Sequence, residues 1–191
     1  MKHPLIHLVK DKERLSSLAK QFGTPLYLYS GKKLQENILR FKTALDLFFP
    51  NNHLCYAIKA NNNPHLVKYM KNVLDTLGGD CSSPGELYVA EKSGINLEDS
   101  IYTGNYESSD DLKTALESGV CINLDDTTSF GRLKIIGLPS RLSFRINPGF
   151  GKGSFSQVTT GGREAKFGIP RDNIVEAYKL ALNEGVSRFG L

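Results

Sequence analysis

The sequence predicts an α/β fold and, within that class, an incomplete (β/α)8 barrel of the TIM type. Short apolar runs alternate with amphipathic stretches along the 191 residues, and this alternation predicts a parallel sheet covered by helices. No G-x-G-x-x-G segment follows the first predicted strand, which disfavours a doubly wound dinucleotide-binding sheet. Polar and charged residues gather directly after the predicted strands, where the active sites of barrels lie.

Apolar runs that are rich in β-branched and aromatic residues predict the strands. In chain order these runs are 25–30, 53–58, 100–104, 120–125, 141–147 and 186–191, and a further short strand is expected within 73–79. The barrel would therefore contain its first six or seven strands.

Amphipathic stretches between these runs predict the helices. Residues 31–49 carry apolar side chains spaced by three and four positions. The stretch 82–94 has clear ends, because Ser83 suits the N-cap, Pro84 the first helical position and Gly94 the end. Further helices are expected from Pro64 onward, at 107–119, more weakly at 127–136, and at 171–185.

The length of the chain does not suffice for a whole barrel, which takes about 250 residues. The chain reaches Leu191 in the middle of an apolar run, so we expect a fragment of a longer barrel protein. Residues 1–23 are expected to form an N-terminal segment, and residues 24–191 the partial barrel.

Composition excludes several classes of protein. Hydrophobic residues make up 40% and charged residues 23% of the chain, which is ordinary for a soluble globular protein. No apolar run approaches the roughly 20 residues that a membrane helix needs. The first residues carry charges throughout and lack the order of a signal peptide, so we expect a cytoplasmic protein without membrane contact.

Cysteine and charge patterns narrow the choice further. The three cysteines, Cys55, Cys81 and Cys121, are far apart and predict reduced thiols rather than disulfides. No spacing of cysteine and histidine suggests a metal site. Basic residues alternate with acidic ones, so the net charge of +4 does not predict nucleic-acid binding, although it would suit a small anionic ligand.

Lys59 follows an apolar strand in the segment CYAIKANNNP. A lysine at the mouth of a barrel, with its pKa lowered by desolvation, would be a reactive amine. The alternative is an ordinary boundary charge whose head group reaches water, and this stretch alone favours that simpler interpretation.

Two further segments offer candidate binding residues. In GGDCSSPGEL, Asp80 and Ser83 precede a helix N-terminus that can hold an anion, but a plain capped turn explains the same residues equally well. Arg145 lies within an apolar strand, so it needs an acidic partner or an anionic ligand. The glycine-rich loop that follows it is either functional or a surface excursion.

Six segments in order resemble one family. FGTPLYLYS, CYAIKANNNP, GGDCSSPGEL, YTGN, FRINPGFGKG and TTGGREAKFGIP are similar to segments of the pyridoxal-phosphate-dependent decarboxylases of diaminopimelate, ornithine and arginine, whose barrel is like that of alanine racemase. The similarity covers nearly the whole chain from residue 22, and its last segments most resemble diaminopimelate decarboxylases and related siderophore-pathway enzymes.

The resemblance assigns roles to four residues. It implies that Lys59 forms the Schiff base with the cofactor, pyridoxal 5'-phosphate, and is therefore catalytic. Asp80 and Ser83 match the segment near the cofactor, and Arg145 matches an arginine of the cofactor pocket. Lys166 matches a position whose role stays open.

The family also has parts that this chain lacks. These are a His-x-Gly-Ser segment, a glycine-rich phosphate loop, an acidic partner of the pyridine nitrogen, and a C-terminal β-domain that completes the site of the partner subunit in a homodimer. The resemblance therefore implies a decarboxylase of a small amino acid, first of all meso-diaminopimelate in lysine biosynthesis, with this part alone inactive. The alternatives are ornithine, arginine or a siderophore precursor as substrate, or a truncated paralogue without activity.

Overall fold

The computed structural model describes residues 10–151, 161–162 and 167–190. The chain divides into two compact units, Met1–Asn52 with Asn72–Leu74, and His53–Lys71 with Asp75–Leu191. The domain boundary expected after residue 23 stays a prediction. Lys166 lies outside the described residues.

The first unit contributes two amphipathic helices, α2 (Lys12–Phe22) and α3 (Gly31–Phe48). Ser30 caps α3 by accepting a hydrogen bond from the Lys33 backbone N–H at 3.3 Å, and the helix predicted at 31–49 is confirmed. The strand predicted at 25–30 is wrong. This segment keeps the alternating exposure of a strand but pairs with no strand among the described residues, and strand pairing depends on a distant neighbour that a local pattern cannot reveal.

The second unit contains a parallel six-stranded sheet. Its strands, in spatial order, are β1 (Cys55–Ala57), β2 (Gly78–Cys81), β3 (Ile101–Tyr102), β4 (Cys121–Leu124), β5 (Leu142–Phe144) and β8 (Phe189–Gly190). The spatial order equals the chain order, as in a barrel, whereas a doubly wound sheet reverses its order at a switch point. A second sheet pairs β6 (Ile146–Asn147) with β7 (Ile169–Pro170), again in parallel.

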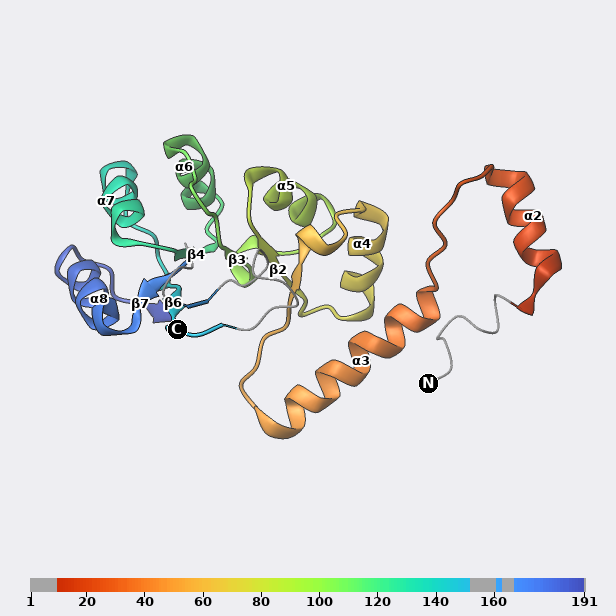
Figure 1. Ribbon diagram of the computed structural model, residues 1–191, viewed down its shortest axis with the longest axis horizontal. Coiled ribbons are helices and arrows are strands. Elements are labelled where there is room, and N and C mark those ends of the chain that lie inside the picture. Colours follow the sequence, from red (N-terminus) through yellow and green to blue (C-terminus); the bar gives the residue numbers. More distant parts are fainter. Residues whose placement is uncertain (1–9, 152–160, 163–166, 191) are drawn as a thin grey trace. The chain divides into compact units, whose positions relative to one another are not determined.

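Helices connect these strands and lie along one side of the sheet, as Figure 1 shows for this unit. They are α4 (Pro64–Val73), α5 (Pro84–Lys92), α6 (Ser109–Glu117), α7 (Thr127–Ile136) and α8 (Ile174–Asn183), with short 3-10 turns η1 (Ile58–Ala60), η2 (Leu97–Asp99) and η4 (Arg171–Asn173). Each helix predicted in this unit is present. None of the described helices is both long and apolar enough to cross a membrane.

The two faces of the large sheet differ in chemistry. One face packs against the helices, and its side chains are almost fully buried: Tyr102, Leu124, Ile122, Leu142 and Phe144. The Phe144 ring meets the rings of Phe130 in α7 and Tyr178 in α8 edge to face, at centroid distances of 6.1 and 5.2 Å. Because side chains alternate along a strand, their sequence neighbours point to the opposite side, which we call the inner face.

Most strands are shorter than the runs that predicted them, and two also differ in continuity or position. The strand expected at 141–147 is divided, because β5 ends at Phe144 and β6 begins at Ile146. The expected strand within 73–79 begins only at Gly78 and continues to Cys81, so both glycines of GGDC lie in a strand rather than in a loop. Gly78 is required there, because its Cα passes close to the backbone of the turn η2 at Asp99.

We predict that Gly78→Ala destabilises the protein. A Cβ at this position would lie 2.1 Å from the Asp99 carbonyl oxygen and 2.6 Å from His53 Nε2. Since a strand backbone cannot move aside easily, the expected loss is roughly 1–3 kcal/mol of unfolding free energy, measured by urea denaturation.

Gly85→Ala is the matched control. A Cβ at Gly85, inside α5, would meet nothing closer than Ser83 Oγ at 3.8 Å. Alanine also favours the helical backbone, so this variant should gain roughly 0.5–1 kcal/mol. Equal stability of the two variants would show that the close approach at Gly78 does not constrain the fold.

Candidate active site

The carboxyl ends of the parallel strands meet at one edge of the large sheet, which we call the carboxyl edge. The polar side chains that end or follow its strands are Lys59, Asp80, Thr103, Asp125 and Arg145. Lys59, Asp80 and Arg145 were predicted as site residues, whereas Thr103 and Asp125 were not.

Lys59 lies in the turn η1 directly after β1. The asparagines that follow shape the path to α4: Asn61 Oδ1 accepts the Asn63 N–H at 3.1 Å, and Asn63 Oδ1 accepts the His65 N–H at 3.0 Å. These local bonds fix the turn and leave the Lys59 side chain exposed at the strand end. Its position, and not its burial, therefore distinguishes it from other lysines.

Asp80 lies beside Lys59 at the carboxyl edge. It pairs in register with Ala57 of β1, two residues before the lysine. Burial raises the pKa of the Asp80 carboxyl, the Lys59 ammonium partly opposes this rise, and the Glu86 carboxylate adds to it. The structure thus brings two of the predicted site residues, Lys59 and Asp80, within electrostatic reach of one another.

Ser83 caps helix α5. Its hydroxyl accepts the Glu86 backbone N–H at 3.3 Å, and Pro84 occupies the first turn. The Glu86 carboxylate in turn accepts the backbone N–H of Ser82 at 2.8 Å, so the reciprocal bond reaches one residue further back than the N-cap. The predicted capped helix start is confirmed, and cofactor binding by Ser83 stays a prediction.

Arg145 has the acidic partner that a cation within an apolar strand was expected to need. Its Nη1 lies 3.6 Å from Asp125 Oδ1, and its guanidinium stacks over the Phe167 ring at 4.7 Å from the centroid. Asp125 follows β4 and is only 8% exposed. Sequence reasoning named the need for a partner but not the residue, because the two lie twenty positions apart and meet only through strand pairing.

A chain of hydrogen bonds crosses three strands on the inner face. Asn123 Nδ2 of β4 donates to Thr103 Oγ1 beyond β3 at 3.2 Å, and Ser143 Oγ of β5 donates to Asn123 Oδ1 at 2.8 Å. Burial makes such bonds costly to break, since each would leave an unpaired polar group. These three residues were also missed, because small polar residues within apolar strands give no distinctive signal.

Glu107 is a buried carboxylate between the carboxyl edge and α6. It is 5% exposed, and neither carboxylate oxygen has a hydrogen-bond partner among the described residues. Burial raises the pKa of the Glu107 carboxyl, and although its own backbone N–H and Arg132 oppose the rise, Asp126 and Asp125 add to it. Nothing in the sequence distinguished Glu107 from an ordinary loop acid.

The cysteines take no part in this chemistry. All three are free, and burial raises the pKa of Cys55 to about 11 and that of Cys81 to about 12. Both thiols are therefore protonated at neutral pH and are poor nucleophiles. Among the residues that the structure describes, no group of three or more histidine, cysteine or acidic side chains could hold a metal ion.

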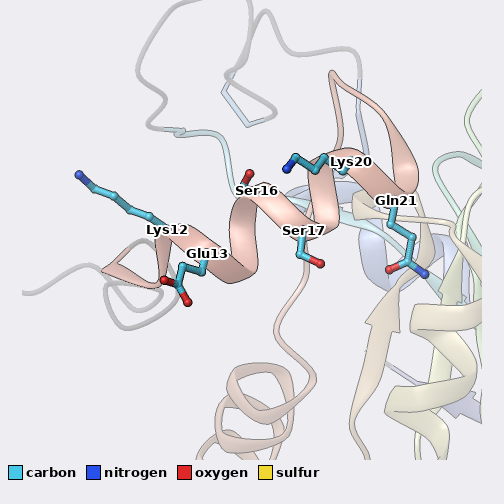
Figure 2. Close-up of a pocket in the computed structure, with 6 residues that line it drawn as sticks. All are labelled: Lys12, Glu13, Ser16, Ser17, Lys20 and Gln21. Atoms are coloured by element: carbon cyan, nitrogen blue, oxygen red, sulfur yellow. The ribbon is translucent and has the colours of Figure 1, made fainter.

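Two surface hollows are formed by described residues. One, of about 690 Å³, follows a face of α2 in the first unit, and its lining residues are Lys12, Glu13, Ser16, Ser17, Lys20 and Gln21 (Figure 2). Another, of about 570 Å³, lies between α5 and α6, where Tyr88 and Glu117 line it. Neither hollow is lined by a side chain of the carboxyl edge, so we locate the candidate site at the strand ends.

This geometry matches a known class of enzyme domain. Residues 32–187 match the family described as pyridoxal-dependent decarboxylase, pyridoxal binding domain, and the chain belongs to that family. The resemblance inferred from the motifs is thereby confirmed, and pyridoxal phosphate is the cofactor of the family.

Two relatives show how far the similarity extends. The diaminopimelate decarboxylase of Thermoplasma acidophilum is 38% identical over 177 residues, which are 93% of this chain and 42% of that protein. The enzyme of the same name from Methanothermobacter thermautotrophicus is 34% identical over 186 residues, 97% of this chain and 43% of that protein. The chain thus spans less than half the length of these relatives.

Solved structures confirm the fold class. The crystal structure of diaminopimelate decarboxylase from Helicobacter pylori, complexed with L-lysine, superposes with a TM-score of 0.83 at 27% identity. The match covers 92% of this chain and 46% of that one.

We predict that Glu107→Gln stabilises the protein at neutral pH. A carboxyl whose pKa is raised on folding favours the folded state at low pH, and this contribution is lost as the pH rises through the folded-state pKa. The neutral glutamine amide does not ionise and so avoids this loss of stability. The unfolding free energy of the variant should therefore exceed that of the wild type by about 1 kcal/mol at pH 8 and by less at pH 5. Thermal unfolding at both pH values measures the difference.

Glu117→Gln is the control for this experiment. Glu117 is exposed on α6 and lies 3.9 Å from Lys113, so its substitution should change stability by less than about 0.5 kcal/mol at either pH. A gain from Glu107→Gln that is equal at both pH values would contradict the assignment of a raised pKa.

Proposed function

We propose that this chain is the cofactor-binding part of a pyridoxal-phosphate-dependent decarboxylase of meso-diaminopimelate, an enzyme that releases carbon dioxide and forms L-lysine. The observation that carries this proposal is the exposed amine of Lys59 beside the Asp80 carboxyl at the carboxyl edge of a pyridoxal-binding domain. The substrate comes from the relatives, because those compared above bear the name diaminopimelate decarboxylase.

The described residues fit this cofactor. An aldehyde needs an accessible primary amine, and Lys59 offers one at a strand end rather than within the core. The inner face below it is polar, with the Thr103, Asn123 and Ser143 side chains already bonded to one another. When bound, pyridoxal phosphate supplies an electron sink for the charge that develops as carbon dioxide leaves.

Each predicted site residue then has a definite task. Lys59 Nζ would hold the cofactor through its aldehyde group, with loss of water, and the Asp80 carboxyl would orient that amine and hold a proton close to it. Arg145 supplies a cation at the same edge for an anionic group. Ser83 holds the start of α5, whose N-terminal N–H groups face the same edge as the strand ends.

The same proposal covers assembly and location. The protein works in the cytoplasm as a homodimer, with residues 24–191 as part of the cofactor-binding barrel, and it binds neither nucleic acid nor membrane. The support is the family membership and the mixed surface charge, with a net +4 spread along the chain. Ornithine, arginine and siderophore precursors are the competing substrates, and residues of this chain do not discriminate among them.

We predict that Lys59 is the residue that carries the cofactor. Treating the protein with pyridoxal phosphate and then borohydride should leave the phosphopyridoxyl group on the peptide that contains Lys59, as measured by mass spectrometry after digestion. Lys59→Arg should abolish both the label and carbon dioxide release from meso-diaminopimelate, because a guanidinium does not form the imine.

Lys92→Arg is the matched control, because Lys92 is an exposed lysine on α5 that lies over the Tyr88 ring. This variant should keep both label and turnover. Labelling confined to another lysine would overturn the site, whereas labelling of Lys59 with release from ornithine or arginine alone would overturn only the substrate.

A further inference from the structure

Asp125 is buried next to a single described cation. Its carboxylate follows β4 with 8% of the residue exposed, and Oδ1 has no hydrogen-bond partner among the described residues. The Arg145 guanidinium lies 3.6 Å away, which is within ion-pair distance but longer than a hydrogen bond. A buried carboxylate is costly unless it is paired, and among the described residues Arg145 is the cation that pairs with Asp125.

Arg145 is held from two sides, and its backbone is fixed as well. Its N–H donates to the Leu124 carbonyl at 2.8 Å, and its carbonyl accepts the Ile169 N–H at 2.7 Å. The guanidinium then lies between the Asp125 carboxylate and the face of the Phe167 ring. The charge of Asp125 on one side and the Phe167 ring on the other define the orientation of the guanidinium. Neither contact is a short hydrogen bond from a guanidinium N–H group.

Arg132 shows what a purely structural arginine looks like in the same fold. Its guanidinium donates to the Glu107 carbonyl oxygen and to Ser129 Oγ, so its donors join α7 to the loop that precedes α6. Arg145 has instead a carboxylate at 3.6 Å and 30% of its side chain exposed. A guanidinium carries five N–H donors in a fixed planar fork, which suits the recognition of an oxyanion.

We infer that Asp125 is a positioning residue, which holds the Arg145 guanidinium at the carboxyl edge in the orientation that binds an oxyanion of the cofactor. Asp125 does not touch the cofactor itself. This inference rests on the proposed function, since it takes pyridoxal phosphate as the ligand of the carboxyl edge.

A double-mutant cycle tests the inference, with the dissociation constant of pyridoxal phosphate as the readout. The variants are D125N, R145Q and D125N/R145Q, and binding is followed in the protein by the absorption of the bound cofactor. Each single variant should weaken binding roughly 10-fold, the factor that corresponds to one charge-assisted contact. The double variant should bind no more than about twofold weaker than R145Q alone, because Asp125 acts only through Arg145.

Independent roles would instead multiply to a loss of roughly 100-fold in the double variant, and this result would overturn the inference. Wild-type affinity in D125N would overturn it too. Failure of the wild-type protein to bind the cofactor at Lys59 would overturn the proposed function instead, so the two failures are distinguishable. Pyridoxal, which lacks the phosphate, serves as a second ligand: an unchanged dissociation constant in D125N assigns the oxyanion to the phosphate, and a weakened one assigns it to the ring oxygen.

D126N is the matched control. Asp126 is the next residue and caps α7 through the Ser129 N–H at 2.6 Å, and asparagine is an equally good cap, so cofactor affinity should stay within about twofold.

If D125N does not fold, D125E and R145K keep both charges and complete the same cycle. D125E should then bind the cofactor more tightly than R145K, and the double variant D125E/R145K should bind it no more weakly than R145K alone. Losses of affinity that multiply in the double variant would again contradict the inference.

Discussion

Parallel pairing of consecutive strands is the constraint on which the other features of the second unit depend. Asp80 lies level with Ala57 on one side and Ile101 on the other, and Asn123 lies level with Ser143. A slip of one residue would transfer every side chain of a strand to the opposite face. The buried apolar face, which packs against the helices, excludes such a slip, and the polar inner face is fixed as a consequence.

The charges at the carboxyl edge form two pairs with the same arrangement. Asp80 on β2 lies within electrostatic reach of Lys59 after β1, and Asp125 after β4 forms an ion pair with Arg145 after β5. In each pair the carboxylate lies on the strand nearer to β3, and the cation lies on the strand further from it. Burial raises the pKa of both carboxyl groups, and the neighbouring cation limits the rise. The charged form of each carboxyl group is therefore stabilised by the cation that follows the adjacent strand.

Local features of this fold were predictable from sequence, and distant pairings were not. The start of α5 at Ser83 and Pro84 could be read directly, because a cap is formed by residues three positions apart. The segment 25–30 was misjudged, because its pattern is that of a strand whereas pairing is decided elsewhere. Arg145 lay between these cases: the cost of a buried charge predicted a partner, but only the sheet register identified it as Asp125. The catalytic role proposed for Lys59 rests on motif resemblance, since its exposed side chain carries no physical signature of its own.

Asp125 and Asp126 are chemically identical neighbours with opposite orientations. One carboxylate turns toward Arg145, and the other turns outward to begin α7. The strand therefore passes into the helix with no spare residue between the ion pair and the cap. During evolution this junction can accept substitutions one at a time, but an insertion or deletion of one residue would move both carboxylates out of place together. Length variation in this family should consequently gather in other loops, and the distance from β4 to α7 should be among the most uniform in the domain.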